Sequence, residues 1–228
     1  MMTNEEIDFE LLQGMARVLN HVFYIYPEKQ QLDGFAQGQL ARNWPLASAA
    51  CELLQQTLSD WLLAKDPERE QLLLALKLDY GQLFFGPGHP KAAPWGSVYT
   101  SETQLLNERS TLALMDFYRE QGITVSAASN EPVDHIGLIF AVIDSLLLQA
   151  VQGGDEQRAL MLLQTLLSEH LLPWSGQCLA LVELHATTDY YRCFAVLAKE
   201  YLVTLSQVLG PRPAAARIPV RAAVAITP

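Results

Sequence analysis

The sequence predicts an all-α protein, on three observations. Hydrophobic residues recur with the i, i+3, i+4 spacing of a helix face through most of the 228 residues. The alternating pattern of half-buried strands is nearly absent, and glycines and prolines separate the periodic segments. Because 50% of the residues are hydrophobic, the chain can bury a sizeable core. We therefore expect a single globular, bundle-like helical domain without a β-sheet.

The N-terminal half contains five periodic segments with recognisable ends. Pro27 is a plausible stop for the first helix, since a proline cannot continue the hydrogen-bond ladder. Asp66 and Pro67 predict an N-cap and a first helical position. Gly122 is well placed to end the fifth helix. The expected helices are Glu5–Tyr26, about 29–41, about 46–63, 66 to the Gly86-Pro87 break, and about 102–121 with an interruption near 107–110.

The C-terminal half is also predicted to be helical, except in three segments. Residues 122–133 are polar and weakly patterned, which makes them the best hinge candidate. Residues 210–228 are rich in Pro, Ala and Arg and predict a mobile or extended tail. Residues 170–174 are expected to form a turn that seats Trp174 in the core. The expected helices run from about 134 to Gly153-Gly154, over 155–169, about 175–186 and about 189–208. This divides the chain into subdomains 1–121 and 134–209, a hinge at 122–133 and a tail at 210–228.

The charge balance limits the partners. With 15 basic and 25 acidic residues, the net charge of −10 argues against nucleic acids and anionic membranes and suits a basic peptide. The acidic first ten residues lack the features of a secretory signal, and no run approaches the length of a membrane helix. Cys51, Cys178 and Cys193 are far apart and odd in number, so they indicate reduced thiols. We expect a cytoplasmic protein.

The segment 86–98 is a rigid loop that cannot pair into a sheet, because its prolines fix φ and lack amide donors. It presents Trp95, whose large apolar face and N–H donor suit a peptide-binding hot spot. A structural loop in which Trp95 caps the core is the alternative. No Gly-Lys-Ser/Thr follows the glycines, which excludes a phosphate loop.

Three polar residues precede the next apolar helix: Glu131, Asp134 and His135. One interpretation is structural, with Asp134 as helix N-cap and His135 satisfied by a neighbour. In the functional interpretation the two carboxylates bind guanidinium groups, with which carboxylates pair bidentately, and His135 tunes or bridges them.

The sequence contains few features that indicate an enzyme. The histidines lack metal-ligand spacing, and no serine or cysteine stands in a nucleophile motif. A metal-independent hydrolase using Asp134 and His135 would need a third convergent group, which is not evident. A general all-α adaptor that binds a folded subunit is a further alternative. We expect a binding protein and no enzyme.

Three motifs together resemble the TorD/DmsD family of cytoplasmic chaperones, which mature molybdenum-containing oxidoreductases of the dimethyl sulfoxide reductase type. The resemblance extends from about Leu11 to about Leu209. Two segments are more similar to the dimethyl sulfoxide reductase branch than to the trimethylamine N-oxide reductase branch: Trp95-Gly96-Ser97-Val98 and residues 110–114. The chain departs from that branch in having Tyr80 and Gly88 where tryptophans are frequent. The motifs are Leu83-Phe84-x-Gly86-Pro87 with Pro94-Trp95-x-Ser97-Val98-Tyr99, Glu131-Pro132-x-Asp134-His135, and His170-Leu171-x-Pro173-Trp174.

The resemblance implies roughly ten helices in two subdomains, with a hinge before the second motif. It also implies binding of the twin-arginine signal peptide and the apo catalytic subunit of a molybdenum-cofactor reductase, and proofreading before export. It implies no obligatory cofactor, although some members bind guanine nucleotide weakly, and it allows a monomer or a helix-swapped homodimer. The expected signal-peptide site consists of Tyr80, Leu83, Phe84, Pro94, Trp95, Ser97, Tyr99, Glu131, Asp134 and His135.

Overall fold

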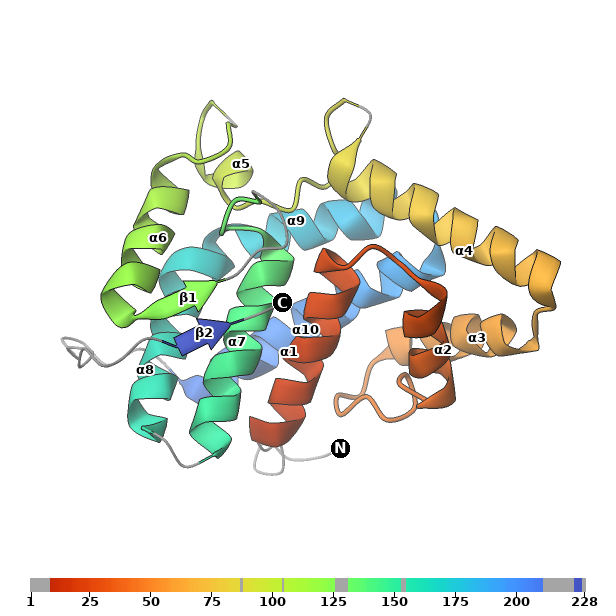
Figure 1. Ribbon diagram of the computed structural model, residues 1–228, viewed down its shortest axis with the longest axis horizontal. Helices are drawn as coiled ribbons and strands as arrows, with labels where there is room; N and C mark the ends of the chain where they lie inside the picture. The colour runs from red at the N-terminus through yellow and green to blue at the C-terminus, as the bar shows by residue number, and fades with distance from the viewer. Residues whose placement is uncertain are drawn as a thin grey trace. The chain divides into compact units, whose positions relative to one another are not determined.

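The computed structural model describes residues 9–86, 88–103, 105–125, 131–152, 155–210 and 224–226. Helices form nearly all of the regular structure in these ranges, so the all-α prediction is confirmed (Figure 1). The elements are α1 Phe9–Tyr24, α2 Lys29–Gln37, α3 Ala49–Leu63, α4 Asp66–Tyr80, the π-helix η1 Gly81–Phe85, α5 Ser97–Thr100, α6 Arg109–Gln121, β1 Ile123–Val125, α7 Ile136–Val151, α8 Glu156–Thr165, the π-helix η2 Leu166–Leu171, α9 Leu172–His185, α10 Asp189–Leu209 and β2 Val224–Ile226.

The contacts divide the chain into two compact units, each assembled from separate stretches of sequence. Unit 1 comprises Met1–Tyr24, Pro94–Gly176 and Tyr201–Pro228, and unit 2 comprises Ile25–Ala93 and Gln177–Glu200. The expected link at 122–133 lies within the sequence of unit 1, and residues 126–130 fall outside the described ranges. The subdomain boundary at that link therefore stays a prediction.

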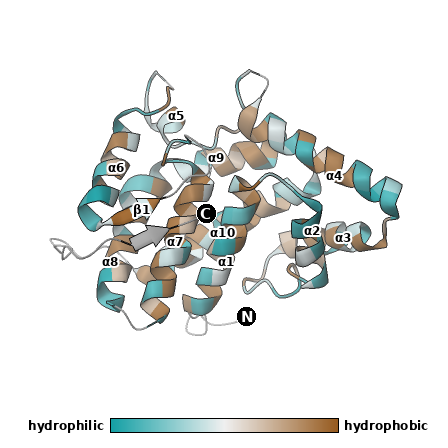
Figure 2. Cartoon of the chain, viewed as in Figure 1, coloured by the Kyte–Doolittle hydropathy of each residue, from teal (hydrophilic) through white to brown (hydrophobic). Residues whose placement is uncertain are grey.

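Unit 1 is built around α7, which is apolar along most of its length and packs beside α1 (Figures 1 and 2). A Cβ on Gly137 would lie 2.6 Å from Cβ of Tyr24, so the absence of a side chain lets the two helices approach closely. Asn20 Nδ2 donates to the Gly137 carbonyl at 2.9 Å across the same contact. Phe23 stacks on Phe140, with ring centroids 6.0 Å apart. The close approach thus sets the start of α7 against the end of α1.

Unit 2 contains the α2–α3 pair and an aromatic core at the end of α4. Tyr80, Phe84 and Tyr191 lie within 5.1–6.0 Å of one another by ring centroids. The carboxylate of Asp79, which is 1% exposed, accepts hydrogen bonds from the Thr187 and Thr188 N–H groups and from Thr188 Oγ1. Asp79 therefore fastens the residues before α10 to α4.

Several predicted boundaries differ from the structure. Lys65, and not Asp66, occupies the N-cap of α4, so the proline falls within the first turn instead of opening it. The helix expected from 102 begins at Arg109, and a short helix, α5, precedes it. The turn expected at 170–174 is absent, because η2 continues directly into α9; Trp174 is nevertheless buried, as predicted. Pro173 is the second residue of α9 and directly follows the π-turn of η2.

A short sheet contradicts the expectation of no sheet at all. β1 and β2 pair in parallel, with Ile123 opposite Val224 and Val125 opposite Ile226 (Figure 1). β1 directly follows Gly122, which ends α6 in the left-handed conformation at φ 67°, as predicted. Of the predicted tail, residues 211–223 and 227–228 lie outside the described ranges.

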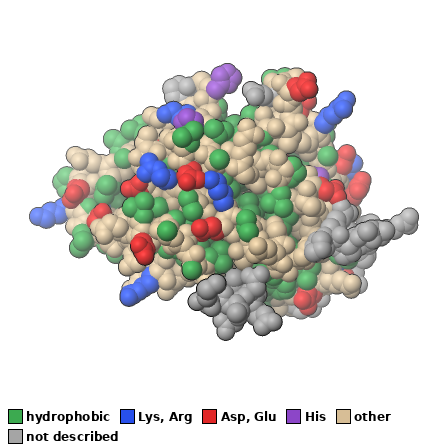
Figure 3. All heavy atoms as spheres, turned by 180° about the vertical axis from the view of Figure 1, so that it is seen from behind, with side chains coloured by type: hydrophobic (Ala, Val, Ile, Leu, Met, Phe, Trp, Pro, Cys, Tyr) green, Lys and Arg blue, Asp and Glu red, His purple; other side chains and the backbone are tan. Residues whose placement is uncertain are grey.

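The surface and the thiols agree with the composition. The face seen in Figure 3 intersperses acidic and basic side chains with exposed apolar ones. Cys178 and Cys193 are buried, Cys51 is half-buried, and all three are free thiols. Within the described ranges, no helix combines the length and the hydropathy needed to cross a membrane.

Candidate functional site

The Pro94-Trp95 loop and the Glu131–His135 motif meet in unit 1. Ile136 N–H donates to the Pro94 carbonyl at 2.8 Å, and Gly96 N–H donates to the Asp134 carbonyl at 3.1 Å. These bonds place Trp95 and His135 opposite one another in an isolated antiparallel bridge. Proline lacks an N–H but keeps its carbonyl acceptor, so Pro94 can contribute to such a bridge. Two motifs about 40 residues apart thus form one backbone unit, called here the bridge cluster.

The buried carboxylate of Asp134 stabilises the bridge cluster through hydrogen bonds. Its side chain is 2% exposed, and Oδ2 accepts hydrogen bonds from Ser97 N–H at 2.7 Å and from Thr111 Oγ1 at 2.9 Å. The structural interpretation, in which Asp134 caps its own helix, is wrong, because His135 occupies the N-cap of α7 and Asp134 accepts from the first amide of α5. Carboxylates that accept from helix N-terminal amides stabilise those helices. Asp134 therefore orients the chain that follows Trp95.

His135 supplies the N-cap of α7 that was assigned to Asp134. Its Nδ1 accepts from Gly137 N–H at 3.1 Å, which leaves the proton of the neutral ring on Nε2. Burial lowers the pKa of His135 to about 3, so the ring is neutral near pH 7. Its ring meets Tyr24 edge-on at 5.2 Å and Trp95 at 6.0 Å. His135 acts here as a cap and a packing surface.

Trp95 and Glu131 form the accessible part of the bridge cluster. Trp95 Nε1–H donates to Glu131 Oε1 at 2.9 Å, and both side chains are half-buried. Tyr99 is also half-buried and stacks on Trp174, with an interplanar angle of 9°. Pro94 and Ser97 are buried. The cluster therefore presents an indole and a carboxylate on a rigid backbone.

The remaining predicted site residues belong to unit 2. Tyr80, Leu83 and Phe84 are at most 1% exposed and belong to the aromatic core of that unit. Seven of the ten predicted residues thus come together in unit 1 and three in unit 2. Sequence reasoning missed Phe85, which is 57% exposed beside them, and Thr111, the buried partner of Asp134. Only the apolar run Leu83-Phe84-Phe85 could have indicated Phe85.

The geometry favours binding over catalysis. The hydrogen bonds of the Asp134 carboxylate run to Ser97 and Thr111, and that of His135 Nδ1 runs to Gly137. Each side chain thus hydrogen-bonds to other groups and not to its neighbour, whereas a hydrolytic dyad requires a base that its partner orients. Among the described residues, no group of three or more His, Cys, Asp or Glu side chains could hold a metal ion.

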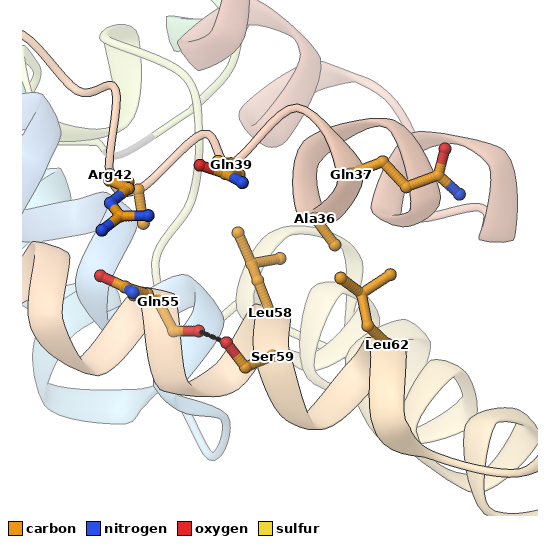
Figure 4. A pocket seen from close by; sticks show the side chains of 9 residues that line it. Ala36, Gln37, Gln39, Arg42, Gln55, Leu58, Ser59 and Leu62 are labelled. Carbon is orange, nitrogen blue, oxygen red and sulfur yellow. Dashed lines mark hydrogen bonds between the residues drawn. The ribbon is translucent and has the colours of Figure 1, made fainter.

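Unit 2 also contains a pocket of about 240 Å³ between α2 and α3. Figure 4 shows Ala36 opposite Leu62, with the polar side chains of Gln39, Arg42 and Gln55 grouped on one side. The Ser59 hydroxyl donates to the Gln55 carbonyl at 2.7 Å within the helix. The pocket thus offers mainly amides and one guanidinium, and no predicted site residue lines it.

Comparisons with known proteins agree on one family. The profile described as "Nitrate reductase delta subunit" matches residues 45–180. The chain is 34% identical over 196 residues to the Tat proofreading chaperone DmsD of Salmonella typhimurium, covering 84% of this chain and 86% of that protein. It is 32% identical to the chaperone protein YcdY of Escherichia coli K12, covering 82% and 89% of the two chains. A shorter match, 33% identical, covers 46% of this chain and 50% of the chaperone protein TorD of Photobacterium profundum.

Proposed function

Because the chain belongs to the TorD/DmsD family, we propose that it is a cytoplasmic chaperone that binds the twin-arginine signal peptide of a molybdenum-cofactor reductase and proofreads it before export. The observation that carries the proposal is the bridge cluster, in which one backbone unit presents Trp95 and Glu131 together. The relatives are named chaperones, which agrees with a binding role and not with an enzyme.

Glu131 and Trp95 are the residues that we propose to contact the arginines. A half-buried carboxylate can pair with a guanidinium bidentately, and an indole face attracts a cation. The neutral ring of His135 adds no positive charge beside Glu131, so it does not repel a basic peptide. Because the backbone of the cluster is already fixed by hydrogen bonds, little ordering free energy is lost on binding.

Asp134 contributes by positioning. Its 2% exposure and its two hydrogen bonds from unit 1 support a role in holding the Trp95 loop in place. This refines the sequence interpretation, in which Asp134 binds guanidinium itself. Pro94, Ser97 and His135 are buried in the same cluster and belong to the same support.

The apolar part of the signal peptide requires a hydrophobic surface. We propose that Tyr80, Leu83 and Phe84 form the packed base of such a surface in unit 2 and that the exposed Phe85 is its contact residue. Phe85 lies against Tyr80, with ring centroids 5.8 Å apart, so its ring is held by the core. The proposal involves no cofactor, and the partner is the apo catalytic subunit that carries the signal peptide.

Calorimetry with a synthetic twin-arginine peptide tests the function. We expect Trp95→Ala to weaken binding by about 2 kcal/mol, as for a hot-spot aromatic, and Glu131→Gln to weaken it less at high salt than at low salt. Glu108→Gln, a carboxylate outside the cluster, is the matched control. A peptide with Lys-Lys in place of Arg-Arg should bind more weakly, since lysine cannot pair bidentately.

Equal affinities of wild type, Trp95→Ala and Glu131→Gln would show that the bridge cluster is not the site. Failure of the wild type to bind the peptide, with binding to a client subunit that lacks its signal peptide, would favour the adaptor function.

A further inference from the structure

Unit 2 contains a second pocket, of about 300 Å³, that no predicted site residue lines. It lies where α2, α3, α4 and the residues that open α10 come together, and it is called here the Trp61–Tyr190 pocket. Its volume is at the lower limit of pockets that enclose a drug-sized ligand, so it fits a group of side-chain size. The lining residues are Leu32, Thr57, Leu58, Asp60, Trp61, Leu72, Ala75, Leu76, Thr187, Thr188, Asp189 and Tyr190.

The lining combines an apolar body with negative charge. Leucines and the rings of Trp61 and Tyr190 supply the apolar surface, and the charged lining residues are Asp60 and Asp189, both carboxylates. Asp189 is paired with Arg192, which is not a lining residue, whereas Asp60 has no ion pair within the described ranges. The pocket therefore suits an apolar group that carries a cationic end.

The walls of this pocket are fixed before any ligand arrives. Trp61 Nε1–H donates to Asp33 Oδ1 at 2.9 Å. The guanidinium of Arg69 donates to the carbonyls of Trp61 and Ala64, at 3.2 and 3.0 Å, and so closes the end of α3. The buried carboxylate of Asp79 holds Thr187 and Thr188. A preorganised pocket retains more of its contact free energy as affinity.

We propose that the Trp61–Tyr190 pocket is a second contact site for the client's signal peptide. A large apolar side chain of the peptide inserts into the pocket, and a neighbouring arginine or lysine of the peptide pairs with Asp60. The proposal rests on the proposed function for the identity of the peptide. Charge complementarity supports it, because the chain carries a net charge of −10 and Asp60, which accepts a hydrogen bond from Gln56 Nε2 at 2.7 Å, has no ion pair within the described ranges. The pocket of Figure 4, by contrast, is lined by Arg42 and no carboxylate, which suits a basic segment less well.

Filling the pocket provides the direct test. Ala75 is exposed on α4 and lines the pocket, so Ala75→Phe should occupy it without disturbing the core. With a labelled twin-arginine peptide and fluorescence anisotropy, we expect Ala75→Phe to weaken binding about tenfold. Asp60→Asn should weaken it and reduce its salt dependence. Ala180→Phe on α9 and Glu52→Gln on α3, both exposed and outside the lining, should bind as wild type does.

The outcomes separate the two proposals. If Trp95→Ala weakens binding while Ala75→Phe and Asp60→Asn bind as wild type does, the second site is refuted and the proposed function stands. If the wild type fails to bind the peptide, both are refuted. Peptide-induced shifts of the Leu72 and Leu76 methyl resonances, lost in Ala75→Phe but kept in Ala180→Phe, would place the peptide in the pocket.

Discussion

At the scale of single residues, Asp134 joins three elements through one carboxylate. Asp134 lies just before α7. Its carboxylate accepts one hydrogen bond from the first amide of α5 and another from the Thr111 hydroxyl on α6. The sequence indicated that Asp134 is a capping residue, because an aspartate before an apolar helix usually caps it. It could not indicate which helix is capped, since Ser97 lies 37 positions away and only the tertiary fold brings it close.

Removing one donor of this carboxylate should destabilise the protein. We expect Thr111→Val, which keeps the shape and removes the hydroxyl, to lower the free energy of unfolding by about 2 kcal/mol, because hydrogen bonds to buried charged groups contribute that much. Urea denaturation measures the change. Thr57→Val is the control, since the Thr57 hydroxyl makes an exposed hydrogen bond to the Leu53 carbonyl of its own helix and its loss should cost less than about 0.5 kcal/mol. Equal losses in the two variants would mean that Asp134 does not depend on Thr111.

His135 makes stability depend on pH in a defined window. Its pKa falls from 6.5 in the unfolded chain to about 3 in the folded protein, so between these values the unfolded chain binds more protons. Stability contributed by the neutral ring is complete above pH 6.5 and decreases as the pH falls towards 3. At pH 5 the loss relative to pH 7 should be about 2 kcal/mol from this group.

The variant His135→Asn isolates that contribution. Asparagine can accept from Gly137 N–H as an N-cap but does not titrate, so its unfolding free energy should fall less between pH 7 and pH 5. The pKa values of His21 and His170 are also lowered by burial, and both residues remain in the two proteins, so a residual slope is expected. Identical pH profiles would contradict a buried neutral His135.

At the scale of elements, hydrophobic periodicity located the long helices but missed the short elements that depend on tertiary contacts. α5 is four residues long, too short to show a helical period, and its first amide is satisfied by Asp134 from another segment. β1 is three residues long and pairs with a segment about 100 positions later, so no local pattern could predict it. Pro173 was expected in a turn but lies within a continuous helical stretch that includes the π-turn η2.

The contact of α1 with α7 depends on the missing side chain at Gly137. An added Cβ would lie 2.6 Å from Cβ and 2.9 Å from N of Tyr24, and a backbone atom cannot move away cheaply. We expect Gly137→Ala to lower the free energy of unfolding by about 1–3 kcal/mol, as other overpacking substitutions do. Gly176→Ala, in helix α9 with no atom within 4 Å, should instead stabilise by about 0.5–1 kcal/mol. Thermal unfolding of both variants compares the two effects, and a gain in Gly137→Ala would contradict the close approach.

At the scale of the whole molecule, the linear order of the sequence does not follow the two units. Sequence reasoning placed the first 121 residues together, yet α1 belongs with α7 in unit 1, and residues 25–93 belong with part of α9 and α10 in unit 2. A helical pattern shows which face of a helix is buried but not which helix covers it, because many partners offer similar apolar faces. The motifs assigned Trp95 and Glu131 to one site, and a hydrogen bond joins the two side chains; their part in peptide binding stays a prediction.

The link at 122–133 leads to a prediction about assembly. Unit 1 requires α1 and α5–α6 from one side of this link and α7 from the other. We propose that the link can open, so that α7 and the residues after it pack onto a second chain and rebuild the same unit 1 contacts in a helix-swapped dimer. Short links favour such exchange, because the closed form within one chain becomes strained.

Deleting Ala127, Ala128 and Ser129 should therefore raise the dimer fraction at equal concentration, as measured by size exclusion with light scattering. Replacing the same three residues with glycine keeps the length and should leave that fraction close to the wild-type value. In the swapped form Asp134 would accept hydrogen bonds from Ser97 and Thr111 of the other chain, so the bridge cluster and its peptide affinity should survive. A deletion variant that stays monomeric at every concentration, or a dimer that has lost peptide binding, would contradict exchange at this link.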